Sequence, residues 1–358
     1  MKILVLQDRL RSGGTERQSV LLADAFAAAG HQALLLTFRP GGALGGPARA
    51  GRRALQPFDL GLDWFAPGLG GAAARFGPQA VLAMGRMANC YAGALQRRLP
   101  RAAVVATFRT GKPLPWLFRR SLLRARHVVA NSQEAREVLL SRYGVPPERA
   151  SFIYNPLVFA PLPDPAPARA AARAEFGAGP GTAVLLSVAM FRPEKGQREL
   201  IEAVAGLPGD LDWQLWLAGE GPELPGCRRL VEERRLGGRV RFAGYRPDPA
   251  PLYAGADVAV HASRSEALSN FLIEAQARGL PGVAMDAQGV RECLIGDLTG
   301  FVVPAGDREG FRAALVRLLR EAPATRASRG AAAREFARQT FDPSRQVAAY
   351  LELIGRLI

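Results

Sequence analysis

The stretch Val258-Ala-Val-His-Ala262, followed by Ser265-Glu-Ala-Leu-Ser-Asn-Phe-Leu-Ile-Glu-Ala-Gln-Ala-Arg-Gly-Leu-Pro281, joins a strand, a polar loop and a helix. Its apolar start predicts a buried strand, and the pattern from Asn270 onward predicts a helix. Glu266 then lies in the loop, and Glu274 lies one turn inside the helix. A helix N-terminus offers free N–H groups and a positive dipole end, which favour phosphate. Carboxylates beside such a site suit hydroxyl groups, so we predict a ligand that carries hydroxyl groups next to its phosphates.

Strand and helix patterns alternate along both halves of the chain. Strands are predicted at residues 3–6, 33–37, 80–84, 102–107, 128–130, 183–188, 214–218, 240–242, 258–261 and 282–285. Helices are predicted at residues 16–29, 89–98, 133–143, 199–205, 227–235, from 270 onward and at 343–358. This alternation indicates parallel sheets, whose ligands bind at the carboxyl ends of the strands. Residues 40–78 are rich in Gly, Pro and Ala, and their pattern predicts little.

A proline-dense stretch at residues 155–167 interrupts the alternation and predicts an interdomain linker. The chain has 358 residues, which suits two domains of ordinary size, and 48% of them are hydrophobic, which is enough for two cores. The predicted fold class is α/β, with two doubly wound, Rossmann-like parallel-sheet domains facing a cleft. We place their boundary near residue 160.

The composition excludes several classes of protein. The start of the chain is too short to be the apolar part of a signal peptide, and no run approaches the roughly 18 apolar residues of a membrane span. Three distant cysteines, Cys90, Cys227 and Cys293, argue against a disulfide framework and a zinc site. We expect a cytoplasmic protein that contacts a membrane, if at all, only at the membrane surface.

The net charge of +15 comes almost entirely from the N-terminal half. Residues 1–178 hold 24 Lys and Arg against 10 Asp and Glu, whereas the remainder holds 23 against 22. Within the basic half, Pro115-Trp-Leu-Phe-Arg-Arg-Ser-Leu-Leu-Arg-Ala-Arg126 interleaves apolar residues with arginines. It predicts either an amphipathic segment on an anionic membrane or a partly buried helix whose arginines face water. No nucleic-acid recognition motif is present, so we expect no nucleic-acid partner.

Two further segments have the composition of ligand-binding loops. In Arg11-Ser-Gly-Gly-Thr-Glu-Arg17, two glycines after the first strand let the backbone approach a ligand, although a plain turn capped by Thr15 fits too. In Ser187-Val-Ala-Met-Phe-Arg-Pro-Glu-Lys-Gly-Gln197, Lys195 follows a strand. It stands out because only three of the 47 basic residues are lysines.

Taken together, these motifs resemble those of the retaining family 4 glycosyltransferases, which have the two-domain GT-B fold. The resemblance rests on the Glu-x7-Glu pair, the Gly-Gly-x-Glu loop and the Pro-Glu-Lys-Gly segment. It extends to Gly279-Leu-Pro281 and Gly289-Val-Arg-Glu292, and it covers most of the chain from Gly13 to about Pro304. It implies an acceptor-binding domain over residues 1–160, a donor-binding domain over 161–342, and a C-terminal helix, 343–358, that packs back on the first domain.

The resemblance also implies roles for individual residues. Lys195 would hold the diphosphate of a nucleotide sugar. Arg192 is expected to be a second cation, because Met190 stands where the family commonly has an arginine. Glu266 would lie near the transferred sugar, and Glu274 would accept hydrogen bonds from the ribose. The catalytic residues are therefore expected to be Glu266, Lys195 and Arg192.

Other implied donor-site residues offer backbone groups or line the nucleoside pocket. They are Gly13, Gly14, Glu220, Tyr245, Asn270, Phe271, Leu272 and Glu274. Arg109 stands where many family members have a histidine that faces the acceptor. We expect it to contact the acceptor, but an arginine will not act as a base near neutral pH.

The expected function is transfer of a hexose from a nucleoside diphosphate sugar, with UDP as the expected carrier, to a saccharide or lipid-linked acceptor in lipopolysaccharide or polysaccharide synthesis. The basic first half suggests that the protein works on the inner face of the cell membrane. A nucleotide-sugar epimerase and a non-catalytic binder of nucleotide sugars or polyanions remain alternatives. No metal or other cofactor is expected, because Asp210-Leu-Asp212, the one Asp-x-Asp sequence, precedes a strand where Asp is common in turns.

Overall fold

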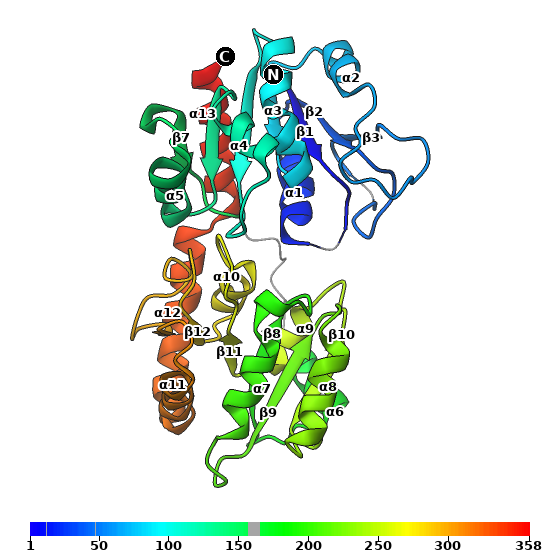
Figure 1. Cartoon of the computed structure of the whole chain (residues 1–358). Coiled ribbons are helices and arrows are strands. Elements are labelled where there is room, and N and C mark those ends of the chain that lie inside the picture. The colour runs from blue at the N-terminus through cyan, green and yellow to red at the C-terminus, as the bar shows by residue number, and fades with distance from the viewer. Residues whose placement is uncertain (12, 47, 157–164) are drawn as a thin grey trace. The chain divides into compact units, whose positions relative to one another are not determined.

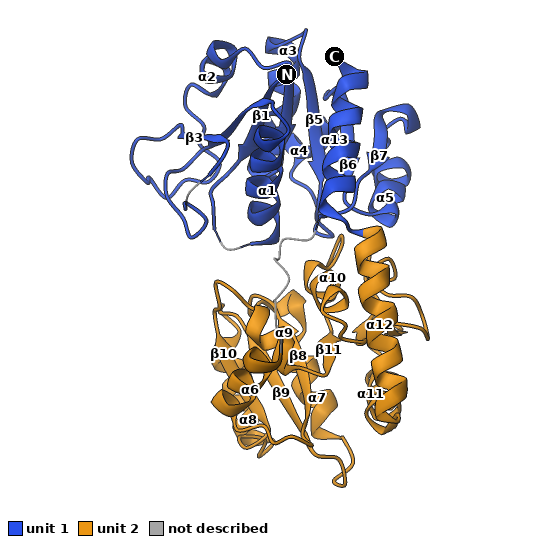
Figure 2. Cartoon of the chain, turned by 180° about the vertical axis from the view of Figure 1, so that it is seen from behind, with its two compact units in different colours: residues 1–158, 341–358 blue, residues 159–340 orange. Residues whose placement is uncertain are grey.

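The computed structural model describes residues 1–358 with the exception of 12, 47 and 157–164. The chain forms two compact units (Figure 2). Unit 1 contains residues 1–158 and 341–358, and unit 2 contains residues 159–340. The predicted linker at 155–167 falls mostly on residues 157–164, outside the described residues. In the described part of the chain, no helix is both long and apolar enough to cross a membrane.

Unit 1 is built on a seven-stranded sheet in the order β3-β2-β1-β4-β5-β6-β7, and all its neighbouring strands are parallel. The order reverses between β1 and β4, as in doubly wound folds. Its strands are β1 (Lys2–Gln7), β2 (Gln32–Thr37), β3 (Gly51–Ala54), β4 (Ala80–Ala83), β5 (Ala103–Phe108), β6 (His127–Ala130) and β7 (Ala150–Phe152). Its helices are α1 (Gly14–Ala28), α2 (Leu69–Phe76), α3 (Arg86–Arg98), α4 (Trp116–Leu122), α5 (Gln133–Tyr143), η1 (Pro147–Arg149) and α13 (Pro343–Leu357).

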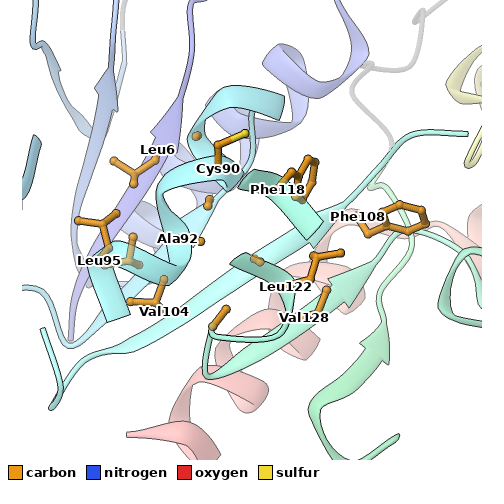
Figure 3. Packing of buried hydrophobic residues seen from close by; sticks show 14 of the residues in the cluster. Leu6, Cys90, Ala92, Leu95, Val104, Phe108, Phe118, Leu122 and Val128 are labelled. Atoms are coloured by element: carbon orange, nitrogen blue, oxygen red, sulfur yellow. The ribbon is translucent and has the colours of Figure 1, made fainter. Parts of the chain in front are cut away.

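Helices cover both faces of the unit 1 sheet, because alternate residues of its buried strands point to opposite sides. Leu4 and Leu6 join a cluster with residues of α3, α4 and α5, part of which Figure 3 shows. Ile3 and Val5 join a second cluster, in which residues of α1 and α13 pack together. The C-terminal helix therefore completes the core of unit 1.

Unit 2 is built on a six-stranded parallel sheet in the order β10-β9-β8-β11-β12-β13. Here the order reverses between β8 and β11. Its strands are β8 (Ala183–Val188), β9 (Trp213–Ala218), β10 (Val240–Gly244), β11 (Val258–His261), β12 (Gly282–Met285) and β13 (Gly300–Val303). Its helices are α6 (Pro165–Phe176), η2 (Pro193–Lys195), α7 (Gln197–Ala205), α8 (Leu224–Glu233), α9 (Ala250–Gly255), α10 (Asn270–Ala277), α11 (Arg308–Arg320) and α12 (Pro323–Thr340) (Figure 1).

The structure corrects two of the sequence predictions. The predicted linker runs too far, because α6 begins at Pro165; proline is tolerated in the first turn of a helix, where its missing N–H is not needed. Residues 40–78 contain β3 and α2, which the sequence did not predict. The strand β3 is short and includes two arginines, so it lacks the apolar alternation of a strand.

Candidate functional site

Two loops that follow adjacent strands of unit 2 meet at the point where its strand order reverses. One follows β8 and contains η2, and the other follows β11. The N–H of Arg264 donates to the carbonyl of Glu194 at 2.8 Å, and the Ser263 hydroxyl donates to the same oxygen at 3.0 Å. Gly196 has a φ of +70°, and a Cβ there would lie 2.1 Å from the carbonyl oxygen of Ala262. A glycine is therefore required for the two loops to approach this closely.

This approach brings Lys195 and Glu266 together. Lys195 Nζ lies 2.6 Å from Glu266 Oε1, and the two side chains are 24% and 11% exposed. The pair is thus largely shielded from water, where an ion pair is stronger but costs more to desolvate. The sequence predicted both residues for this region but not their contact.

His261, the last residue of β11, approaches the same carboxylate oxygen. Its Nε2 lies 3.4 Å from Glu266 Oε1. Burial is the main cause that lowers the pKa of His261 to about 4, with nearby Glu266 acting to raise it and Lys195 to lower it. The imidazole is therefore neutral near pH 7. Sequence reasoning gave His261 no role, because it only bordered a strand.

Glu274 lies in α10 and is buried. The hydroxyl of Tyr253, from α9, donates to Glu274 Oε2 at 2.6 Å, and the Tyr253 ring stacks on Phe271. Ser269 caps α10 by accepting a hydrogen bond from the N–H of Leu272 at 3.4 Å. Of the three predicted backbone donors, Leu272 is therefore already engaged by the cap.

A third loop, after β9, is locked onto the loop after β8. The N–H of Phe191 donates to the carbonyl of Glu220 at 2.9 Å. Gly219 and Gly221 have positive φ, and a Cβ on either would come within 2.3 Å of a carbonyl oxygen of the β8 loop. The side chain of Glu220 is exposed, so its backbone makes the contact. Tyr245 is half-buried and follows Gly244, whose carbonyl accepts from the N–H of Gly219.

Arg192 precedes η2 and is half-buried. Among the described residues, its side chain has no hydrogen bond or ion pair, so it is available to a ligand. Met190, at the position where an arginine was expected, is 40% exposed, and its carbonyl accepts from Gln197 Nε2.

Several buried polar atoms on the unit 2 loops lack a hydrogen-bond partner within the described ranges. They are Ser265 Oγ, Gln197 Oε1, Gln288 Nε2 and His261 Nε2. Buried polar groups are normally satisfied by protein, water or ligand. Ser265 lies in the loop that carries Glu266, and Gln197 directly follows the loop that carries Lys195, which is consistent with a polar ligand there.

The predicted residues of the N-terminal half lie in unit 1. Gly13 is the N-cap of α1, and Gly14 is its first residue. Arg109 bridges two parts of unit 1: Nη1 donates to Asn155 Oδ1 at 2.5 Å, and Nη2 donates to the hydroxyl of Tyr350 in α13 at 2.7 Å. This gives Arg109 a structural role, and its contact with an acceptor stays a prediction.

The remaining polar candidates have contacts of their own. Asp210 pairs with Arg320 at 3.0 Å, and Asp212 accepts from the hydroxyl of Thr182 at 2.7 Å. Both aspartates therefore make contacts that hold the turn directly before β9. Among the residues that the structure describes, no group of three or more His, Cys, Asp or Glu residues is placed to hold a metal ion.

Comparison with known protein families matches both halves of the chain. A model described as Glycosyltransferase Family 4 matches residues 12–158, and one described as Glycosyl transferases group 1 matches residues 168–336. The lipopolysaccharide core biosynthesis glycosyltransferase LpsE of Rhizobium meliloti is 37% identical over 147 residues, which is 41% of this chain and 42% of LpsE. LpsD of the same organism is 32% identical over 190 residues, 53% of this chain and 54% of LpsD. The chain thus spans about half the length of the curated relatives it matches.

Solved structures share the fold of the whole chain. HepE of Anabaena, crystallised in complex with UDP, has a TM-score of 0.84 at 23% identity and covers 99% of this chain and 100% of its own. Sucrose-phosphate synthase of Thermosynechococcus elongatus has a TM-score of 0.81 at 22% identity, covering 100% of this chain and 99% of its own. These likenesses confirm the predicted GT-B fold class, with its two parallel-sheet α/β domains.

Proposed function

Because the chain belongs to glycosyltransferase family 4, we propose that it transfers a hexose from a nucleoside diphosphate sugar to a hydroxyl group of a saccharide or lipid-linked acceptor. The proposed donor is a UDP-sugar, and the proposed setting is cell-envelope glycan synthesis. The names of LpsE and LpsD, both lipopolysaccharide core biosynthesis enzymes, support the acceptor class. The HepE complexes with UDP and with UDP-glucose support the donor class.

The observation that carries this proposal is the Lys195–Glu266 pair at the reversal point of the unit 2 sheet. Ligands of doubly wound sheets bind at such points, beyond the carboxyl ends of the strands. In the proposed complex, Lys195 turns to the diphosphate and Glu266 lies beside the transferred sugar. Buried Glu274, oriented by Tyr253, accepts hydrogen bonds from the ribose hydroxyl groups.

The proposed reaction retains the configuration of the sugar. The bond between the anomeric carbon and the phosphate oxygen breaks, and the acceptor oxygen bonds to that carbon on the same face. The acceptor proton passes to the departing phosphate. Lys195, Arg192 and the amides of Asn270 and Phe271 stabilise the negative charge that builds on the leaving group, so the reaction needs no metal in this proposal.

We also propose that unit 1 rests on an anionic membrane surface. In α4, Phe118 and Leu122 are buried, whereas Trp116 and Leu117 are 65% and 53% exposed. The segment is therefore a partly buried helix that nevertheless presents apolar residues to solvent. Arginines 119, 120, 124 and 126 accompany them, and exposed apolar groups flanked by cations suit an anionic bilayer.

A second apolar stretch of unit 1 lies between β3 and α2. Its exposed large residues are Phe58, Leu60, Leu62, Trp64 and Phe65. Asp63 in this stretch pairs with Arg39 and Arg11, and the carbonyl of Trp64 accepts from the Tyr91 hydroxyl of α3. These contacts hold the stretch against the unit while its apolar side chains face solvent, which supports the same proposal.

The test of the activity is incubation with UDP-α-hexoses and lipopolysaccharide core saccharides, followed by NMR of the product. The proposal predicts a new α-glycosidic bond that forms only when the acceptor is present. A changed sugar formed from the donor alone would show an epimerase. Nucleotide binding with no product from any tested acceptor would favour a non-catalytic binder, and a β-linked product would contradict retention.

A further inference from the structure

We propose that His261 is a positioning residue that holds the Glu266 carboxylate once Lys195 turns to the donor diphosphate. The proposal deepens the proposed function and rests on it, because it requires a diphosphate beside Lys195. Neither the sequence motifs around His261 nor its spacing from other residues assigns it a role. The basis of the proposal is the geometry of three side chains around one oxygen atom.

That oxygen is Oε1 of Glu266. Lys195 Nζ lies 2.6 Å from it, whereas His261 Nε2 lies 3.4 Å from it. The ammonium is at the short distance of a charge-assisted hydrogen bond, and the imidazole is beyond good hydrogen-bond range. Accordingly, His261 Nε2 has no hydrogen bond of adequate geometry among the described residues, although the atom is buried. The Glu266 carboxylate therefore has one hydrogen-bond donor in contact, Lys195, and a second potential donor, His261, just out of range.

A diphosphate would change this balance. Its charge attracts the Lys195 ammonium more strongly than a single carboxylate does, and the ammonium can turn because its side chain is 24% exposed. Glu266 cannot follow into water, since its side chain is only 11% exposed. A buried carboxylate that loses its partner incurs a large free-energy cost unless another donor replaces it.

His261 meets the requirements for that replacement. It is fixed at the end of β11 and is 4% exposed, and its ring lies 6.1 Å from the apolar ring of Phe271. Burial keeps its pKa low, so the ring is neutral, and in the tautomer that carries the proton on Nε2 it can donate this N–H without a change of charge. A shift of a few tenths of an ångström would bring the two atoms to normal hydrogen-bond distance. Glu266 would then stay ionised and oriented while Lys195 binds the phosphates.

NMR of the imidazole protons tests this exchange directly, because the chain has only three histidines, His31, His127 and His261. On saturation with UDP, the Nε2–H of His261 should shift downfield and exchange more slowly with water. In Lys195→Gln without nucleotide, the same proton should already be shifted, since the ammonium is gone. Nucleotide binding with an unchanged His261 signal would overturn the proposal while leaving the proposed function intact.

Matched variants separate positioning from packing. The readout is UDP release from a UDP-sugar, with UDP affinity measured in parallel. His261→Leu fills the space without a donor, and its kcat should fall by about tenfold to a hundredfold with little change in UDP affinity. His261→Gln supplies an amide N–H and should recover most of that loss. Equal losses in both variants, or none in His261→Leu, would contradict the proposal.

Failure of the proposed function would look different. Folded wild-type protein that binds none of UDP, GDP and ADP would remove the premise, and the His261 signal would then be unaffected by nucleotide for a separate reason. If His261→Leu does not fold, His261→Gln and the imidazole spectra of the wild type still decide the question.

Discussion

Two residues of the candidate site owe their properties to burial. Glu274 is buried beside Tyr253, which orients one of its carboxylate oxygens at 2.6 Å. His261 is buried beside Glu266 and stays neutral because burial lowers its pKa to about 4. Before any ligand arrives, Glu274 is therefore already oriented and His261 is already neutral. This reduces the ordering that binding requires.

The lowered pKa of His261 predicts that acid destabilises the protein. The folded pKa is about 4, below the usual 6.5, so the unfolded chain binds the proton more readily. Stability from this group is complete above pH 6.5 and is lost as pH falls toward 4, with about 2 kcal/mol lost by pH 5. Unfolding of the wild type and of His261→Gln should show a smaller difference between pH 7 and pH 5 in the variant.

The comparison variant is His31→Gln. Burial also lowers the pKa of His31, but this residue is half-buried whereas His261 is 4% exposed, so its removal should change the pH dependence less. The other shifted groups remain in both proteins and cancel: burial lowers the pKa of His127 to about 4 and raises that of Asp8 to about 6, with opposite effects on stability. An identical pH dependence in the wild type and His261→Gln would contradict the assigned burial.

At the scale of elements, glycines determine how closely the loops approach. Gly196, Gly219 and Gly221 each combine a positive φ with a carbonyl oxygen where a Cβ would lie. Together they bring the loops after β8, β9 and β11 into backbone contact. The ion pair between Lys195 and Glu266 depends on this contact, because the two residues come from different loops.

Gly196→Ala should therefore separate Lys195 from Glu266. The new Cβ would clash with the carbonyl of Ala262, and the positive φ would be strained, for a destabilisation of about 2 kcal/mol. Gly209→Ala is the control, since nothing lies within 4 Å of its would-be Cβ. Chemical denaturation and UDP titration should show losses in the first variant only. Retained UDP affinity in Gly196→Ala would contradict the requirement for close loops.

The sequence predicted most buried elements because each carries a clear pattern. The bounds of β8, β11, β12 and α5 agree with the prediction. It missed β7 and β13, which are short, and α12, whose Ala- and Arg-rich sequence has no strong apolar stripe. It also missed α6, α9 and α11, although α11 buries Phe311, Leu315 and Leu318. The hydrophobic pattern of a segment indicates helix or strand only where one face of the segment is consistently buried.

The candidate site was predicted in part for a similar reason. Lys195, Glu266 and Glu274 could be placed near strand ends or a helix start from local pattern alone. Their contacts with one another, with Tyr253 and with His261 could not. Those contacts depend on which strands are neighbours and on the paths of the loops, which no single segment specifies.

At the scale of the whole molecule, the C-terminal helix belongs to unit 1 although unit 2 separates it in sequence. Tyr350, Leu353 and Ile354 of α13 pack in the same cluster as Phe26 of α1. The core between α1, α13 and the sheet of unit 1 is thus closed. The apolar residues near α4 remain exposed elsewhere on the surface of unit 1.

These exposed residues predict membrane binding by unit 1. Leu117→Ser should reduce sedimentation with vesicles of phosphatidylglycerol and phosphatidylcholine at low salt, by roughly threefold or more. Leu298→Ser is the matched control, since Leu298 is 52% exposed and lies in unit 2. Wild-type protein that stays in the supernatant, or equal loss in both variants, would contradict the proposed surface.

The most direct test of the account is calorimetric titration with UDP, GDP and ADP. The wild type should bind one of them, UDP in the proposal, at about micromolar affinity. Glu274→Ala should weaken that binding by about tenfold or more, because a buried hydrogen-bond acceptor for the ribose is lost. Glu233→Ala, which removes an exposed carboxylate of α8, should bind like the wild type. Folded wild-type protein that binds none of the three, or equal affinity in Glu274→Ala, would contradict the assignment of the donor site.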